Sequence, residues 1–143
     1  MSTTTVPIPL IKEVMTQSPL SISSESNLLS ALQVFREKKI RHLPVQKDGK
    51  LVGVLTDGEV KIACSLENSG ELSVENVMSP DPYCVSPETP IDEVAGKMAK
   101  HKYGCALVVD QTGKPIGIFT DIDGLRLLAK YLQAAAGQQT TKG

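Results

Sequence analysis

Few side chains in this sequence are suited to covalent or metal chemistry. The 143 residues include two histidines, His42 and His101, and three cysteines with no Cys-x-x-Cys pair. Zinc sites and nucleophile–base triads need several such groups at fixed spacing. The paired carboxylates Asp121 and Asp123 suit the first turn of a helix. The sequence therefore predicts that the protein is not an enzyme, that it has no metal site, and that its odd number of thiols stays reduced inside the cell.

Two threonine–acid pairs fall where an apolar segment leads into a polar one. Thr56 is followed three residues later by Glu59, and Thr120 by Asp123. A threonine in such a place caps the start of a helix, and an acidic residue in the first turn favours the helix dipole. The spacing by itself therefore predicts two capped helices.

A basic cluster precedes the first apolar strand. Arg36, Lys38 and Lys39 fall at the end of a predicted helix, where cations usually offset the dipole. Arg41 and His42 lie beyond that helix, and two interpretations stay open for them. They contact an anionic group such as phosphate, or they are ordinary strand residues whose side chains are satisfied locally.

Composition limits the class of protein. Lys and Arg total 15, Asp and Glu total 16, and the net charge is −1, so the chain has no field to attract nucleic acid. No apolar run approaches the roughly 18 residues of a membrane span. The first residues lack the charged and apolar regions of a secretory signal. We therefore expect a cytoplasmic globular protein with no membrane insertion.

The chain repeats itself. Val14-Met15 returns as Val77-Met78 at a shift of 63 residues, and Gly49-Lys50 returns as Gly113-Lys114 at a shift of 64. The repeat covers residues 11–63 and 74–127, which is most of the chain. Repeats of this kind are units that bury their apolar faces against one another.

Each copy predicts an extended piece, a helix, two short strands and a second helix. The strands are His42–Gln46 with Leu51–Leu55, and Cys105–Val109 with Pro115–Phe119. The first helices are expected to be capped by Ser26 and Thr89 and to bury two stripes, Leu28, Leu32 and Phe35 in one and Ile91, Ala95 and Met98 in the other. The predicted fold class is α+β, with two β-α-β-β-α repeats packed together.

Composition also suggests boundaries. These are a mobile N-terminus at 1–7, repeat 1 at 8–66, a linker at 67–73, repeat 2 at 74–136 and a mobile tail at 137–143.

The paired pattern resembles a tandem pair of cystathionine-β-synthase (CBS) domains, or Bateman module. The segments that carry the resemblance are Val14–Thr16, Ile40–Val45, Asp48–Thr56 and Gly117–Asp123. The resemblance implies pseudo-twofold symmetry, two equivalent clefts, disc-like dimers, and regulation rather than catalysis. It also implies adenosine-containing ligands, AMP, ADP or ATP first among them, with no obligatory cofactor.

The resemblance further implies that each cleft is built from both copies. Cleft A would combine Ile118, Thr120 and Asp123 with Thr16, Leu20, Ile22 and Ile40, and cleft B would combine Val54, Thr56 and Glu59 with Tyr83, Val85 and Tyr103. The phosphate-facing strand starts would be Arg41-His42 and Gly104-Cys105. In such a site the threonine hydroxyl serves phosphate, and the aspartate accepts hydrogen bonds from the ribose hydroxyls.

The clefts are predicted to differ, because Glu59 stands where the family motif has aspartate. Cleft A would have the better ribose acceptor, Asp123, and cleft B the better cation, although Arg41 could also reach a phosphate region between them. Tyr83 and Tyr103 either stack on a base or pack half-buried. We expect cleft A to bind an adenine nucleotide or nucleoside, and cleft B to bind it more weakly or to bind something else.

Two functions remain open at this stage. The first is a regulatory module that senses an adenine nucleotide and passes occupancy to an unknown effector protein or to a dimer. The alternative is a structural or interaction module with degenerate clefts and no nucleotide function. The C-terminal helix carries leucines around much of its circumference, including Leu125, Leu128 and Leu132, which predicts a homodimer.

Overall fold

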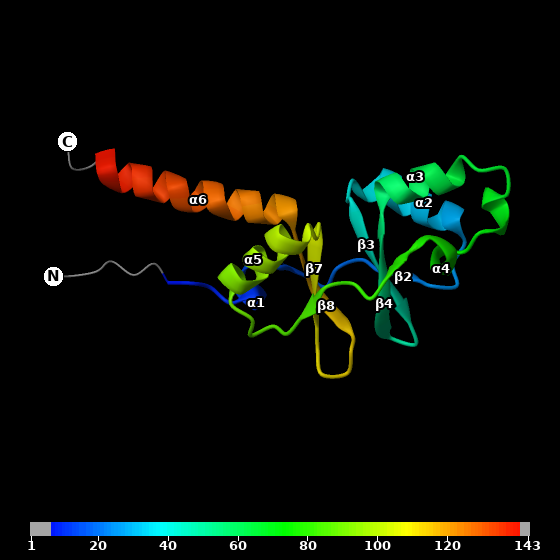
Figure 1. Cartoon of the computed structure of the whole chain (residues 1–143), viewed down its shortest axis with the longest axis horizontal. Coiled ribbons are helices and arrows are strands. Elements are labelled where there is room, and N and C mark those ends of the chain that lie inside the picture. The colour runs from blue at the N-terminus through cyan, green and yellow to red at the C-terminus, as the bar shows by residue number, and fades with distance from the viewer. Residues whose placement is uncertain (1–6, 141–143) are drawn as a thin grey trace.

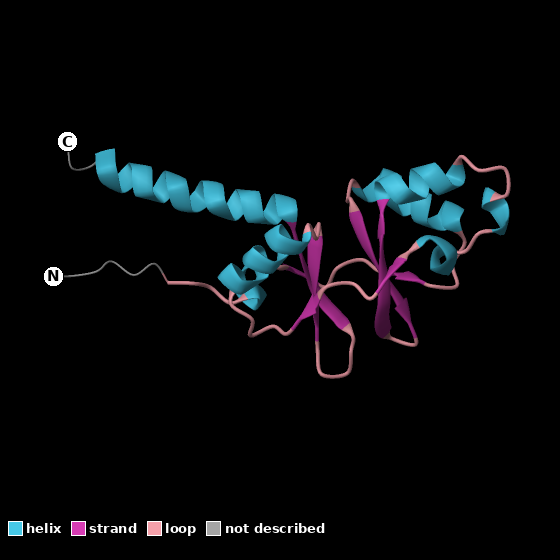
Figure 2. Cartoon of the chain, viewed as in Figure 1, coloured by secondary structure: helices cyan, strands magenta, loops and turns pink. Residues whose placement is uncertain are grey.

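Two four-stranded sheets lie side by side in the middle of the molecule, with helices outside them (Figures 1 and 2). The computed structural model describes residues 7–140. The first sheet has the order β2 (Ile22–Ser23), β3 (His42–Lys47), β4 (Lys50–Thr56), β5 (Ser79–Pro80). The second has the order β1 (Thr16–Gln17), β8 (Pro115–Thr120), β7 (Cys105–Val109), β6 (Cys84–Val85). The predicted α+β fold of two repeats is confirmed.

Each sheet is covered by two longer helices of its own repeat and by one short helix of the other. Repeat 1 supplies α2 (Leu28–Lys38) and α3 (Asp57–Cys64), and repeat 2 supplies α5 (Ile91–His101) and α6 (Asp121–Thr140). The short elements are α1 (Ile11–Val14), η1 (Ser69–Glu71) and α4 (Val74–Val77). Figure 1 shows α6 extending well past the rest of the described chain.

The apolar faces of the first helices follow the helical period, with two corrections. Helix α2 buries Leu28, Ala31 and Phe35, while Leu32 packs half-buried against the same core. Helix α5 buries Ile91, Val94 and Met98, and Ala95 is exposed. The stripe predicted through Ala95 was therefore wrong, because Val94 occupies the core-facing position one residue earlier.

The predicted helix caps were also wrong by one residue. Asn27 caps α2 by accepting a hydrogen bond from Ser30 N at 2.8 Å, and α5 begins directly after Pro90. Ser26 and Thr89 serve another purpose: their carbonyls accept hydrogen bonds from Val74 N and Ile11 N, each at 2.8 Å. Those bonds come from the opposite repeat.

The opening segment of each repeat belongs structurally to the other repeat. Ile11 is fully buried in the core of repeat 2, and Val74 is fully buried in the core of repeat 1. Strand β1 pairs with β8 and strand β5 pairs with β4. Each repeat thus gives an edge strand to the sheet of the other repeat. The two sheets also contact each other, because Leu51 and Val54 pack on Leu107 and Ile118.

The exchanged segments fit because a glycine faces each of them. A Cβ added at Gly53 would lie 2.5 Å from Met78 Sδ and 2.9 Å from the Ser79 carbonyl oxygen. A Cβ added at Gly117 would collide with Met15 Sδ. The Val-Met repeat seen in the sequence is therefore the part of each copy that packs on the glycine of the other.

Some predicted boundaries fall differently in the structure. The tail expected from residue 137 is helical as far as Thr140, because α6 continues without a break. Residues 141–143, and residues 1–6 of the predicted mobile N-terminus, lie outside the described chain. The linker predicted at 67–73 contains η1, and the boundaries of the two repeats remain predictions.

Candidate functional site

Cleft A is a cavity of about 300 Å³ between the start of β3 and the end of β8. It is lined by Thr16, Lys39, Ile40, Arg41, His42, Ile118, Thr120, Asp121, Ile122, Asp123 and Arg126. The structure thus brings together five of the seven residues assigned to this cleft, namely Thr16, Ile40, Ile118, Thr120 and Asp123. The cleft lies between the repeats, since the start of β3 lies on one side and β8, with its paired strand β1 and the start of α6, lies on the other.

The threonine–acid pair of cleft A closes the first turn of α6. Asp123 Oδ2 accepts a hydrogen bond from Thr120 N at 2.9 Å, and Thr120 Oγ1 accepts one from Asp123 N at 3.2 Å. The other carboxylate oxygen of Asp123 lies 3.5 Å from a guanidinium nitrogen of Arg126, whose side chain is largely exposed. Such an exposed pair is weak. Oδ1 is therefore the oxygen of Asp123 that a ligand could take over.

Cleft A carries most of the positive charge, which corrects the prediction that cleft B has the better cation. Lys39, Arg41 and Arg126 all line cleft A. Lys39 ends α2 in the left-handed conformation (φ 53°), and Arg41 follows two residues later at the start of β3. Arg126 lies one helical turn beyond Asp123. An anion and a ribose would both find partners here.

Cleft B is a cavity of about 310 Å³ at the equivalent place in the other half. It is lined by His42, Val54, Thr56, Ser79, Pro80, Asp81, Pro82, Tyr83, Lys102, Tyr103, Gly104 and Cys105. Four of the six residues assigned to this cleft are among them, namely Val54, Thr56, Tyr83 and Tyr103, and the strand start Gly104-Cys105 lies there as well. Its side-chain cations are Lys102 and, when protonated, His42.

Glu59 is engaged locally rather than lining cleft B. Its Oε1 accepts hydrogen bonds from Thr56 Oγ1 at 2.7 Å and from Thr56 N at 3.2 Å, while Thr56 Oγ1 accepts one from Glu59 N. Its Oε2 lies 3.4 Å from Ser79 Oγ. The extra methylene of glutamate lets the carboxylate reach back and occupy the threonine hydroxyl, so this pair is a complete capping box.

Aromatic rings form one wall of cleft B. The Tyr83 and Tyr103 rings stack with centroids 5.0 Å apart, and the Tyr103 and His101 rings stack at 5.2 Å. Burial raises the pKa of the Tyr83 hydroxyl, and the Glu93 carboxylate acts in the same direction. The tyrosines pack on one another, and the 41% exposure of Tyr103 leaves part of its ring and hydroxyl open to the cleft.

His42 lines both clefts. Its burial lowers its pKa below the usual 6.5, against the opposing effect of the Asp121 carboxylate. Its counterpart in repeat 2 is Cys105, a thiol whose pKa burial raises to about 12. The pseudo-twofold axis therefore relates an imidazole to an uncharged thiol.

Three further predicted residues lie away from the cavities to which they were assigned. Leu20 is exposed outside the lining of cleft A, and Ile22 is buried in the core of repeat 1. Val85 lines a different cavity between β6 and the end of β7. Sequence reasoning missed Lys39, Arg126 and Lys102. One sequence feature could have identified Lys39 and Lys102 as cleft residues: both directly follow a helix at the same position of the repeat.

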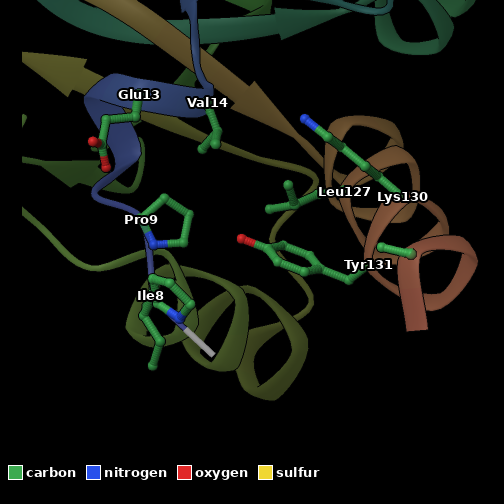
Figure 3. A pocket seen from close by; sticks show the side chains of 9 residues that line it. Ile8, Pro9, Glu13, Val14, Leu127, Lys130 and Tyr131 are labelled. Carbon is green, nitrogen blue, oxygen red and sulfur yellow. The ribbon is translucent and has the colours of Figure 1, made fainter. Parts of the chain in front are cut away.

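A third cavity, an apolar groove, separates α6 from the N-terminal segment (Figure 3). It has a volume of about 530 Å³, and Pro7, Ile8, Pro9, Val14, Leu127, Tyr131 and Ala134 form its apolar lining, with Glu13 and Lys130 at its edge. In Figure 3, Tyr131 reaches from α6 toward Pro9. The groove lacks the threonine–acid pair of the two clefts, and its α6 residues lie in the middle of that helix.

The CBS domain family model matches residues 11–65 and 74–130. The chain belongs to the CBS-domain family. Its first curated relative is the L-aspartate semialdehyde sulfurtransferase of Methanocaldococcus jannaschii, 30% identical over 122 residues. The match covers 85% of this chain and 23% of that enzyme, so this chain spans about a quarter of that relative's length.

Solved CBS domain pairs have the same fold. The CBS domain pair of protein MJ0100 in complex with 5′-methylthioadenosine and S-adenosyl-L-methionine is 29% identical, with a TM-score of 0.79 over 87% of this chain and 99% of that one. CBSX2 in complex with AMP is 27% identical, with a TM-score of 0.75 over 85% and 97%. The tandem repeat is therefore a CBS domain pair, and both of these solved pairs hold adenosine-containing ligands.

The described part of the chain has neither a metal-binding cluster nor a membrane-spanning helix. Residues 7–140 hold no group of three or more His, Cys, Asp or Glu side chains placed to bind a metal ion. Within the same residues, no helix is long and apolar enough to span a membrane.

Proposed function

We propose that this CBS domain pair is a cytoplasmic, non-catalytic regulatory module that senses an adenosine-containing ligand, with AMP, ADP or ATP the first choice, in cleft A. The observation that carries the proposal is the convergence in one cavity of the Asp123 carboxylate and three basic side chains from both repeats. The ligands named for the CBS pairs of MJ0100 and of CBSX2 all contain adenosine, which supports the same class of ligand here.

Different residues of cleft A bind the ribose, the base and the phosphate of the ligand. Asp123 Oδ1 exchanges its exposed partner Arg126 for the ribose hydroxyls, which a carboxylate accepts well. The apolar side chains of Ile40 and Ile118 flank the base. Arg41 and Lys39 bind phosphate, and Arg126, once released from Asp123, adds to that charge.

Cleft B binds the same ligand class more weakly or binds a different one. The Glu59 carboxylate is already paired with Thr56, so ribose would have to break a hydrogen bond of 2.7 Å. Tyr83 and Tyr103 offer an apolar and aromatic wall, and Lys102 is balanced by Asp81 in the same lining. These features favour an uncharged adenosine compound over a polyphosphate.

Helix α6 transmits the occupancy of cleft A to other proteins. Ile122, Asp123 and Arg126 at its start line cleft A, while Leu125, Leu128 and Leu132 further along are 61%, 53% and 60% exposed. The leucines follow the 3–4 spacing of a helix that pairs with another helix. We therefore propose a homodimer through α6, which passes cleft occupancy to the second subunit or to an effector protein.

A module with degenerate clefts and no nucleotide function is the second candidate. The locked Thr56–Glu59 pair of cleft B favours it. In that case the exposed face of α6 would be the functional surface. The two candidates differ in whether a small ligand stabilises the folded chain.

A thermal-shift screen separates them. AMP, ADP, ATP, S-adenosylmethionine and adenosine would each be added to the full chain and to Asp123→Asn, which keeps an oxygen to cap α6. A rise in melting temperature with an adenosine compound, lost in Asp123→Asn, supports the proposal. Unchanged melting with every compound supports the interaction module.

Light scattering of the wild type and of Leu128→Glu tests the dimer, because a monomeric wild type would disprove it.

A further inference from the structure

We propose that the two clefts share one anion-binding group, the imidazole of His42, so that a phosphate-bearing ligand in one cleft excludes a second phosphate-bearing ligand from the other. This inference rests on the adenosine-ligand function proposed for the clefts. It adds a rule of occupancy: one nucleotide per chain, with the second cleft left to a ligand that has no phosphate.

His42 is the residue that the two cavities have in common. Among residues 7–140, no other side chain lines both cleft A and cleft B. It lies at the start of β3, opposite Thr56 of β4 in the ladder, and so beside the threonine of cleft B. Arg41, its neighbour in sequence, lines cleft A alone.

The absence of a side chain at Gly104 gives His42 its position between the clefts. A Cβ added at Gly104 would lie 2.7 Å from His42 Nε2. Gly104 is the repeat-2 counterpart of Arg41, so the imidazole occupies space that a second arginine would fill. The imidazole of repeat 1 therefore reaches across to the strand start of repeat 2.

Repeat 2 offers no second group of this kind. The counterpart of His42 is Cys105, which is buried and lies opposite Thr120 of β8. Its pKa of about 12 keeps the thiol neutral, and a thiol is a weak donor. A strictly symmetric module would hold two donors here, and this chain holds one.

A neutral imidazole can serve one phosphate at a time, because only one of its nitrogens carries a hydrogen. Burial favours this neutral form, and Arg41, the residue before β3, acts in the same direction. The carboxylates that face His42 oppose it: Asp57 and Glu59 from α3, and Asp121 from α6. Protonation gives both nitrogens a hydrogen, so the exclusion should weaken as the pH falls and the imidazole takes up a proton.

The clefts depend on His42 to different degrees. Without His42, cleft A keeps three cations, Lys39, Arg41 and Arg126, against two carboxylates, whereas cleft B keeps Lys102 against Asp81. A nucleotide in cleft A that holds His42 therefore leaves cleft B with little charge to bind phosphate. Adenosine has no phosphate and needs no hydrogen bond from His42, so it should bind in cleft B while a nucleotide occupies cleft A.

Two matched variants test the sharing. Thr16 on β1 and Ser79 on β5 are equivalent residues of the repeat, both exposed, and each lines one cleft. Thr16→Trp should block cleft A and Ser79→Trp cleft B; Thr16→Phe and Ser79→Phe replace them if a tryptophan disturbs folding, as judged by circular dichroism. Calorimetry counts the AMP bound per chain, and nuclear magnetic resonance follows the two histidine rings through a pH titration.

We expect one AMP per chain in the wild type and in both variants at about pH 7.5. AMP should raise the pKa of His42 in both variants, because a phosphate favours the imidazolium form, while adenosine should not. His101, which lies outside both linings but stacks on Tyr103 of cleft B, is the internal control for a ligand in cleft A. Two AMP per wild-type chain at about pH 7.5, or a response of His42 in one variant alone, would overturn the sharing. Absence of AMP binding in the wild type would overturn the ligand function itself.

Discussion

Clefts A and B occupy equivalent places in the two repeats, yet one methylene group makes their chemistry different. In cleft A the short Asp123 reaches the backbone of Thr120 at 2.9 Å and keeps its second oxygen near the surface. In cleft B the longer Glu59 bends back onto both the backbone and the hydroxyl of Thr56. The same capping geometry thus leaves the Thr120 hydroxyl as an acceptor from Asp123 N, whereas the Thr56 hydroxyl also donates to the Glu59 carboxylate.

The distribution of cations follows a similar pattern. Lys39 and Lys102 are equivalent residues, each in the left-handed conformation after a helix, and each lines one cleft. Arg41 and Arg126 add to cleft A alone, and their counterparts in the other repeat are Gly104 and Ile62. A symmetric backbone can therefore carry an asymmetric site when a few side chains differ.

The largest expected effect is on ligand affinity. Asp123→Ala should weaken AMP binding by about 10- to 100-fold, because hydrogen bonds to a charged group contribute about 1.5–3 kcal/mol. Glu59→Ala should leave the affinity of cleft A within about twofold, although both variants lose a similar helix cap worth about 1 kcal/mol. Calorimetry with AMP measures the first effect and urea unfolding the second. Equal loss of affinity in the two variants would contradict the assignment of cleft A as the main site.

The second comparison concerns the glycines that receive the exchanged segments. Gly53→Ala and Gly117→Ala should each lower the free energy of unfolding by about 1–3 kcal/mol, the usual cost of overpacking. Gly53→Ala should cost more, because its Cβ meets the backbone oxygen of Ser79, whereas the Cβ of Gly117→Ala meets the flexible Met15 side chain. Urea unfolding measures both.

Gly96→Ala in α5 is the control for this pair. A Cβ added at Gly96 has no atom within 4 Å, so alanine should stabilise the helix by up to about 1 kcal/mol. A loss of stability in Gly96→Ala similar to that of the other two would show that the close approach of Met15 and Met78 is not the cause.

The third comparison separates the phosphate-binding side chains. Arg41→Ala should weaken AMP binding by about tenfold and leave adenosine binding unchanged, since a hydrogen bond to a charged group is worth at least about 1.5 kcal/mol. Lys102→Ala should have a smaller effect on AMP, because Asp81 offsets the charge of Lys102 in cleft B. Calorimetry with both ligands is the measurement. A loss of adenosine binding in Arg41→Ala would indicate a structural role instead.

The smallest expected effect is a dependence of stability on pH. The native pKa of His42 is below the unfolded value of 6.5, so the unfolded chain binds the proton more readily. Stability from this group is complete above about pH 6.5 and is lost as the pH falls toward the native pKa. His42→Gln should flatten that part of the curve of unfolding free energy against pH, and an unchanged slope would contradict it.

The hairpins, the long helices and the pairing of the repeats could be predicted from the sequence, because period and turn residues act over short distances. The exact caps could not, since the carbonyls of Ser26 and Thr89 are taken by segments from the opposite repeat. The cleft that Arg41 lines could not be predicted from the sequence either. Arg41 lies in the bend before β3 and His42 begins that strand, so only the three-dimensional placement of this segment assigns Arg41 to cleft A and His42 to both clefts.

The exchange of edges has a consequence for the order in which the chain folds during synthesis. Helix α1 and strand β1 are made first, but their partners are Thr89 and strand β8. A chain that leaves the ribosome N-terminus first must therefore hold its opening segment unpaired until residue 120 has emerged. The repeat that ends in sequence near residue 65 gains its last strand only with Ser79–Pro80. Neither half of the pair holds all the strands of its own sheet, and α1 and β1 are therefore among the last elements to find their partners.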